Sequence, residues 1–391
     1  MINLIYALGV FSSQFYIFKS GVPQPAHYLF LAAIFFTLYK SRWRIGFSGY
    51  KAIYDPLYAF VAYAFFLNLI WSIILQSFEF NLSSIYYAYG LIISLFISNR
   101  LSSDNRFRLY LTRAVVWGIV ALVFANLVGL GHEAGSRYMG FFNDPNQMAF
   151  WVICSYSIFC LIEKDKIIVK MLLFMACAFL VLLSMSRSGL VGLSAIFFGV
   201  IAIFFSDARN SNGDSLKMHT KIVILVAFAV LLLIAFFALQ DLILNAFERF
   251  SETDFDEQAD IRGYGRILAF PGYLLFGVGQ GLDVRFNSPV EIHSTWAGLL
   301  FYYGVLGLTL FLIFLYRVVN RFKFSQILII SGPLFYSFST FGLRTPIFWL
   351  LIAAAIFAAK NNNLTSRNKF IASKVSRGHL WSLSAENAFH K

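Results

Sequence analysis

The chain has 391 residues, of which 59% are hydrophobic and 13% are charged. This composition excludes a string of soluble domains and indicates a protein that crosses a membrane many times. The net charge of +12 does not indicate nucleic-acid binding, because the Lys and Arg residues flank apolar segments instead of gathering in one basic stretch. The fold class predicted from these numbers is an all-α integral membrane protein.

Twelve apolar segments follow one another along the chain, and we expect each of them to be a transmembrane helix. They cover about 2–18, 23–39, 52–75, 82–98, 109–130, 148–162, 171–185, 189–205, 222–241, 295–316, 326–341 and 346–359. The first lacks a basic n-region and a small-residue cleavage site, so we expect a retained helix and not a signal peptide. Several are shorter than the ~20 residues that a straight span needs. These are expected to extend into their loops or to cross where the bilayer is thin.

Most Lys and Arg residues fall in the even-numbered breaks between these segments or in the C-terminal tail. Because basic loops stay on the cytoplasmic side, this asymmetry predicts that both termini are cytoplasmic. A few basic residues lie on the opposite side, against this bias, and they therefore point to function. They are Lys19, Arg137, Arg187, Arg249, Arg262, Arg266, Arg285 and Arg344.

The outward breaks are unequal in length, and the longest is the acidic loop 242–294. Its apolar middle, Ile267–Phe276, predicts a short helix lying in the membrane interface. The expected organisation is N-terminal helices 1–130, a core 131–316 that includes this loop, C-terminal helices 317–359 and a disordered basic cytoplasmic tail 360–391.

Arg137 is followed by Asn143-Asp144-Pro145-Asn146 just before an apolar segment. This run is typical of a turn and a helix cap. Together with Arg137, its polar side chains could also line a pocket, so Asn143 and Asn146 are candidate pocket residues.

Ser186-Arg187-Ser188-Gly189 interrupts two apolar runs, which puts Arg187 at the outer membrane boundary. A charge at this depth is costly unless it is paired, so it usually faces a polar cavity. The alternative is an arginine that extends to the lipid headgroups.

Arg262 and Arg266 bracket Gly263-Tyr264-Gly265 in the long loop. Arginine binds phosphate oxygens bidentately and stays charged, so arginines converging from separate loops would suit a diphosphate. The alternative is ion pairing with acids of the same loop. Those acids are Glu252, Asp254, Asp256, Glu257 and Asp260.

His293 opens the tenth apolar segment, in Glu291-Ile292-His293-Ser294. A histidine can take a proton from an attacking hydroxyl. It could equally be a residue at the start of a helix, hydrogen-bonded to backbone. Asp254-Phe255-Asp256 is similar to the D-x-D of metal-dependent sugar transferases, but acidic loops often contain this spacing. We therefore predict no metal or other cofactor.

Three stretches, in this order, resemble the O-antigen ligase and polysaccharide polymerase family. Residues 137–149 are similar to its pattern R-x-x-G-x-F-x-x-P-N-x-x-A, and Ser186-Arg187-Ser188-Gly189 resembles its Ser-Arg-small pair. Residues 266–279 and then His293, with Gly304 and Gly307, resemble its large outer loop and the histidine-led helix. The resemblance covers about 131–316. Phe270 stands where the family often has Trp, and Ser294 where it often has Asn.

The resemblance implies a glycosyltransferase of the bacterial plasma membrane, with a GT-C-like bundle and one large periplasmic loop bearing short helices. It implies that Arg187 and Arg266, with Arg137, hold the diphosphate of an undecaprenyl-diphosphate-linked glycan on the periplasmic face. It further implies that His293 is the base. Arg262 and Tyr303 are then further candidates for the substrate pocket.

The predicted function is that of a polysaccharide polymerase, which moves a glycan from the lipid diphosphate to a sugar hydroxyl of another lipid-linked repeat unit. A ligase that joins finished chains to a lipid A-core or a protein needs the same side chains and is the alternative. A transporter or flippase is less well supported, because the polar residues lie in outer loops and not mid-membrane. Membrane lipids and a chain-length regulator protein are the expected partners.

Overall fold

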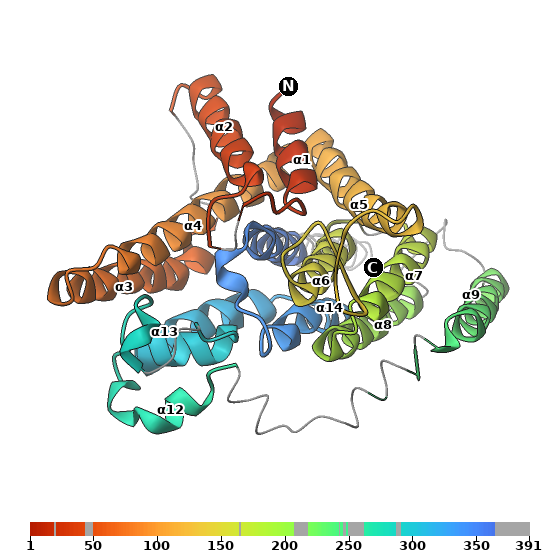
Figure 1. The fold of residues 1–391 in the computed structure, drawn as a ribbon. Helices are drawn as coiled ribbons and strands as arrows, with labels where there is room; N and C mark the ends of the chain where they lie inside the picture. Colours follow the sequence, from red (N-terminus) through yellow and green to blue (C-terminus); the bar gives the residue numbers. More distant parts are fainter. Residues whose placement is uncertain are drawn as a thin grey trace, which may run out of the picture.

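The helices follow one another along the chain and enclose one short hairpin (Figure 1). The computed structural model describes residues 1–18, 21–43, 50–163, 166–206, 218–241, 262–286 and 291–363, together with residues 243, 244 and 248. The helices are α1 (Ile2–Ser12), α2 (Pro25–Lys40), α3 (Lys51–Ile74), α4 (Glu79–Ser103), α5 (Asn105–Leu127), α6 (Pro145–Ile162), α7 (Ile167–Leu183), α8 (Arg187–Ser206), α9 (Met218–Ala238), α12 (Gly265–Ala269), α13 (Thr295–Val319) and α14 (Phe324–Tyr336). The strands β1 (His132–Ala134) and β2 (Arg137–Gly140) pair antiparallel, and the short 3-10 helices are η2 (Pro271–Tyr273), η3 (Asp283–Phe286) and η4 (Gly342–Arg344). Residues 346–363 form a further helix.

Each of the twelve apolar segments expected from the sequence is helical over most of its length. Among the described residues, six helices are long and apolar enough to cross a membrane: α3, α4, α5, α6, α8 and α13. The helices α1, α7 and α14 are apolar but shorter. The prediction of an all-α membrane protein is therefore confirmed.

The first helix is shorter than predicted. The sequence predicts a helix to residue 18, but α1 ends at Ser12. The Ser13 hydroxyl donates to the Val10 carbonyl at 2.6 Å, and the Gln14 amide donates to the Phe11 carbonyl at 3.0 Å. Side chains therefore donate to carbonyls of the last turn, where the hydrogen-bond ladder of the helix ends.

The apolar stretch Ile267–Phe276 is not one helix as predicted. The helix α12 ends at Ala269, and Phe270 has φ −128° and ψ 57°. The cause is Pro271, which lacks an N–H and disfavours the helical conformation in the residue before it. The short helices α12 and η2 in this stretch agree with the large loop bearing short helices that the resemblance implies.

The helix α6 lies near the middle of the bundle (Figure 1). It packs against α5, α7, α8 and α14, and 89% of its residues are buried. A helix that is apolar on all faces is expected in such a place. Cys154 and Cys160 of α6 and Cys177 of α7 are buried free thiols.

The helices α8 and α14 approach each other closely through glycines. A Cβ added at Gly332 would lie 2.5 Å from the Gly192 carbonyl oxygen, and one at Gly199 would lie 2.8 Å from a side-chain carbon of Ile329. Small residues allow such backbone contact between membrane helices. This contact holds the start of α8 against the end of α14.

Gly332→Ala is therefore expected to destabilise the protein by about 1–3 kcal/mol, because the added methyl group overpacks the contact. The apparent melting temperature of the purified protein in detergent measures this effect. Gly272→Ala is the matched control, since nothing lies within 4 Å of a Cβ at Gly272. Equal melting temperatures for both variants would contradict the close contact.

The helix α13 is broken at Gly304, where φ is 65° and ψ is −175°. The break leaves the Phe301 and Tyr302 carbonyls without partners in α13, and they accept hydrogen bonds from Val278 at 3.2 Å and Gly279 at 2.8 Å. Irregular backbone inside a membrane protein is tolerated where other protein groups satisfy it in this way. The long outer loop is thereby fixed against α13, close to His293.

The ends of the first helices contribute to two different hollows. Met1, Lys40 and Arg100 line one hollow, together with residues near them. Ser13 and Gln24, at the other ends of α1 and α2, line a second hollow. The even-numbered and odd-numbered breaks therefore gather at opposite ends of these helices, as the alternation of charge predicts.

Candidate active site

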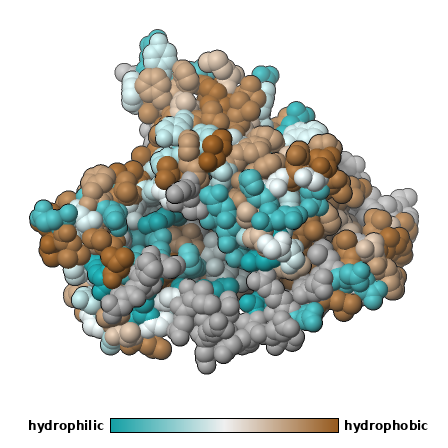
Figure 2. All heavy atoms as spheres, in the orientation of Figure 1, coloured by the Kyte–Doolittle hydropathy of each residue, from teal (hydrophilic) through white to brown (hydrophobic). Residues whose placement is uncertain are grey.

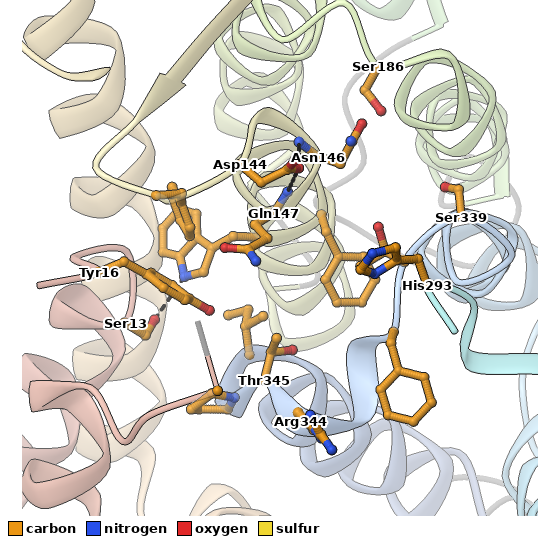
Figure 3. Close-up of a pocket in the computed structure, with 18 of the residues that line it drawn as sticks. Ser13, Tyr16, Asp144, Asn146, Gln147, Ser186, His293, Ser339, Arg344 and Thr345 are labelled. Carbon is orange, nitrogen blue, oxygen red and sulfur yellow. Dashed lines mark hydrogen bonds between the residues drawn. The ribbon is translucent and has the colours of Figure 1, made fainter. Parts of the chain in front are cut away.

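A cavity of about 540 Å³ lies where the odd-numbered breaks meet, and we call it the central cavity. Figure 2 shows polar side chains gathered in the middle of this face between apolar ones. Figure 3 shows labelled side chains from several segments pointing into the hollow. The described lining comes from parts of residues 13–27, 137–151, 185–188, 262–293 and 339–347, together with Tyr86.

Arginines outnumber carboxylates in the described lining of the central cavity. Arg137, Arg187, Arg262 and Arg344 line it, against two carboxylates. An excess of one charge in a cleft concentrates ligands of the opposite charge. Since a guanidinium group binds phosphate oxygens bidentately, the cavity suits a phosphorylated ligand.

The run before α6 has the predicted turn and helix cap. The Asp144 carboxylate accepts from the backbone N–H groups of Asn146 at 2.6 Å and Gln147 at 3.3 Å, so this acid serves the helix start. Asn146 lines the central cavity as predicted. Asn143 is outside the lining: it is exposed, and its amide donates to the Phe18 carbonyl at 3.1 Å.

Arg137 joins three parts of the cavity wall. Its Nε donates to the Ser184 carbonyl at 2.8 Å, and its Nη2 donates to the Asn146 side-chain oxygen at 3.0 Å. These bonds tie β2 to the end of α7 and to the start of α6. Arg137 therefore positions the wall in addition to lining the cavity.

Arg187 is brought to the cavity by contacts of the residue before it. The Ser186 hydroxyl lies 2.8 Å from the Tyr336 hydroxyl, which donates to the Asn146 carbonyl at 2.9 Å. Ser186, Tyr336 and Asn146 thus join the starts of α8 and α6 to the end of α14. Arg187 is the first residue of α8 and lies at this junction.

His293 and Arg262 are neighbours through their backbones. The His293 N–H donates to the Arg262 carbonyl at 3.1 Å. Gly263 allows this contact: its φ is +79°, and a Cβ there would lie 3.1 Å from Ile292. The His293 ring is exposed to the central cavity. Within the described chain, no hydrogen bond or ion pair engages this ring or the Arg262 guanidinium.

Ser294, which stands where the family often has Asn, caps the next helix. Its hydroxyl accepts from the Ala297 N–H at 3.2 Å and contacts the Ser337 carbonyl at 3.4 Å. The following Thr295 N–H donates to the Ser337 carbonyl at 2.8 Å. The position of His293 is therefore set by the helix cap on one side and by Arg262 on the other.

Glu291 and Arg344 form an ion pair at the cavity that the sequence does not predict. Arg344 Nη1 lies 2.7 Å from Glu291 Oε2, and its Nη2 donates to the Ser83 hydroxyl at 2.9 Å. Gln280, which is fully buried, donates to the other Glu291 oxygen. The only sequence signal is the position of Arg344 among the basic residues on the unexpected side.

Arg266 does not line the central cavity, contrary to the prediction that it holds the diphosphate there. Its side chain is 8% exposed and its Nη1 lies 2.7 Å from Asp283 Oδ1. The Tyr302 hydroxyl donates to the same oxygen at 2.9 Å. Arg266 is thus engaged by a buried carboxylate of its own loop, as in the ion-pair alternative, although with a different acid.

Burial dominates the electrostatics of that pair. It raises the pKa of Asp283 above its ordinary value, and the nearby Glu291 raises it further. The Tyr302 hydrogen bond, Arg266 and Arg285 act in the opposite direction but do not outweigh these effects. The charge of Arg266 therefore favours the ionised form of a carboxylate whose burial opposes ionisation.

Tyr303 also lies outside the central cavity. It is fully buried, and its hydroxyl donates to the Gln280 side-chain oxygen at 3.1 Å and accepts from Asn68 at 3.2 Å. Tyr303 is thus not a pocket residue: it holds Gln280, which in turn donates to Glu291 of the Glu291 and Arg344 pair.

The first helices supply a side of the cavity that the sequence does not reveal. We call it the N-terminal wall, and it consists of Ser13, Tyr16, Gln24, His27 and Tyr86. Burial raises the pKa of Tyr16 to about 12, with a further contribution from Tyr86. The Tyr16 hydroxyl therefore stays protonated at neutral pH and can donate a hydrogen bond.

Several predicted features lie outside the described residues. They are Lys19, Arg249, Asp254-Phe255-Asp256, the other loop acids that were weighed as arginine partners, and the tail beyond residue 363. Residues 360–363, assigned to that tail, continue the last helix. Among the described residues, no three His, Cys, Asp or Glu side chains form a group that could hold a metal ion.

Comparison with known proteins adds no assignment to this geometry. No protein-family model matches the chain, and no curated protein matches it.

Proposed function

We propose that this chain is a glycosyltransferase of the bacterial inner membrane that polymerises a surface polysaccharide. It moves a glycan from undecaprenyl diphosphate to a sugar hydroxyl of another lipid-linked repeat unit. The observation that carries the proposal is the convergence of Arg137, Arg187, Arg262 and His293 on one cavity from three breaks of the chain. In this proposal the helices of the twelve apolar segments span the membrane in a GT-C-like bundle, both termini are cytoplasmic, and the central cavity opens to the periplasm.

The proposed reaction needs one base and a site that stabilises negative charge. The acceptor hydroxyl gives its proton to His293 and its oxygen attacks the anomeric carbon of the donor sugar. The bond from that carbon to the phosphate oxygen breaks, and undecaprenyl diphosphate leaves with the bonding electrons. A diphosphate leaves well without a proton, so the protein has only to neutralise the charge that builds on it.

Arg187 and Arg262 are the residues that we assign to the diphosphate. Both line the central cavity, and Arg262 adjoins His293 through the backbone hydrogen bond. Arg137 is bonded to Ser184 and Asn146, so it supports the site and adds charge. Fixed guanidinium groups stabilise the leaving group without reorganisation, which is the role this arrangement supports.

Arg187→Ala is expected to lower polymer synthesis by about 10²–10³-fold, because one preorganised charge is removed from the leaving group. Polymer synthesis by Arg187→Lys is expected to lie between that of wild type and that of Arg187→Ala, since lysine keeps the charge and loses the planar fork. The measurement is the amount of new polymer formed by purified protein from extracted lipid-linked glycan in detergent. Arg113→Ala is the control, because Arg113 is exposed on α5 and lines neither hollow.

Undiminished polymer in Arg187→Ala would overturn the assignment of this arginine. A transporter would form no new glycosidic bond in detergent, so inactive wild-type protein would contradict the enzyme class. Gel analysis of a deletion strain separates the two related reactions. Single capped units without long chains mean a polymerase, whereas long chains left on the carrier lipid mean a ligase.

A further inference from the structure

The N-terminal wall lies across the central cavity from the junction that holds Arg187. In Figure 3, Ser13 and Tyr16 lie on one side of the hollow, and Ser186 and Ser339 lie on the other. The wall comes from the segment between α1 and α2, from the start of α2 and from α4. It is therefore built from a part of the chain that the proposed catalytic residues do not use.

Tyr16 is the side chain of this wall whose hydroxyl is open to the cavity. Its hydroxyl points toward the space between Gln147 and Thr345 (Figure 3). Its ring packs on Phe142 with the ring centroids 5.2 Å apart, so the ring is held in place. Within the described chain, no hydrogen bond engages its hydroxyl.

The rest of the wall is held by internal hydrogen bonds. The Ser13 hydroxyl accepts from the Trp151 indole at 2.8 Å, and the Tyr86 hydroxyl donates to the Gly21 carbonyl at 2.9 Å. The His27 ring stacks on Tyr89 with the ring centroids 5.3 Å apart. The wall is therefore a preformed surface of aromatic rings, hydroxyls and amides.

The chemistry of the N-terminal wall does not suit a diphosphate or a lipid tail. None of its five residues is an arginine or a lysine, and Arg344, whose charge acts on Tyr86, is paired with Glu291. Against a hydrocarbon chain, the Tyr16 hydroxyl would be left without a hydrogen-bond partner. A sugar ring has polar edges and apolar faces, which match fixed aromatic rings beside a few polar groups.

We propose that the N-terminal wall is a glycan subsite, separate from the diphosphate subsite, with Tyr16 donating a hydrogen bond to a sugar oxygen. This inference rests on the proposed function and deepens it, since it assigns the sugars of the lipid-linked repeat unit to the segment between α1 and α2, to α2 and to α4. It makes the first quarter of the chain a determinant of which polysaccharide is built. The donor and the acceptor of a polymerase carry the same repeat unit, so the ligand of this subsite is that repeat unit in either case.

The test separates sugar binding from diphosphate binding with two probes. One probe is undecaprenyl diphosphate without sugar, and the other is the repeat-unit oligosaccharide released from extracted lipid-linked glycan by mild acid. Tyr16→Phe is expected to weaken binding of the oligosaccharide about threefold to tenfold, the effect of one hydrogen bond, and to leave undecaprenyl diphosphate binding unchanged. Arg187→Ala is expected to do the reverse.

Tyr28→Phe is the matched control, because Tyr28 is on α2 but 59% exposed and outside the cavity lining. Equal oligosaccharide binding by wild type, Tyr16→Phe and Tyr28→Phe would overturn the glycan subsite while leaving the proposed function intact. If wild-type protein binds neither probe and forms no polymer, the proposed function itself fails. Loss of both probes in Tyr16→Phe, with a lower melting temperature, would mean a structural role and would also overturn the subsite.

Discussion

His293→Ala is expected to reduce polymer synthesis by about 10²–10⁴-fold, the contribution of a positioned general base. The protein should remain folded in the membrane, because the His293 ring is exposed to the central cavity and has no hydrogen bond within the described chain. Binding of undecaprenyl diphosphate should be unchanged, since the proposed diphosphate ligands remain. The measurement is polymer formed by purified protein, with binding of the lipid measured in parallel.

Chemical rescue distinguishes a base from a residue that only starts α13. Added imidazole should restore part of the activity of His293→Ala, because the removed ring faces a cavity of about 540 Å³ that is large enough to admit it. The same addition should not rescue Arg187→Ala. A His293→Ala strain with polymer of normal length and amount would refute the base assignment.

The helical segments and the convergence of some site residues could be predicted from the sequence. Long apolar runs and the alternation of basic breaks fix where helices lie and which breaks share an end of the bundle. Arg137, Arg187, Arg262 and His293 all fall in odd-numbered breaks, and the structure brings all four to one cavity. The sequence signal is that all four are expected on the same side of the membrane.

The position of Arg266 outside the central cavity could not be predicted, because it depends on an ion-pair partner that only the fold brings close. Asp283 lies 17 residues away in the same loop, with no sequence spacing that marks it. The break of α13 at Gly304 and the loop backbone that bonds there decide where Asp283 and Tyr302 lie. The hydropathy and charge patterns of the sequence predict none of these contacts.

The N-terminal wall could not be predicted from the sequence for a different reason. Tyr16, Gln24 and His27 belong to an apolar part of the chain, where isolated aromatic or polar residues are ordinary. Tyr16 reaches the cavity through tertiary contacts, since its N–H donates to the Phe141 carbonyl and its ring packs on Phe142, just before α6. A single sequence contains no signal that separates such residues from the rest of the core.

Arg266→Ala is expected to destabilise the protein by about 3–5 kcal/mol, because removing one partner of a buried ion pair leaves the other charge uncompensated. The pair is 2.7 Å long, and the two side chains are 8% and 11% exposed. The apparent melting temperature in detergent, compared with that of Arg187→Ala, measures the effect. Arg187→Ala should melt close to wild type, since it leaves this pair intact.

The double variant Arg266→Ala, Asp283→Asn decides between the two roles for Arg266. Asparagine has no charge to leave uncompensated and keeps an oxygen that can accept from the Tyr302 hydroxyl, so most of the lost stability should return. If Arg266 acts only through Asp283, polymer synthesis should return with it. If Arg266 instead holds the diphosphate, as the family resemblance implies, the double variant should be stable and still inactive. Stability and activity recovering together would show that the loop needs Arg266 to neutralise Asp283, and that the charge facing the leaving group comes from other arginines.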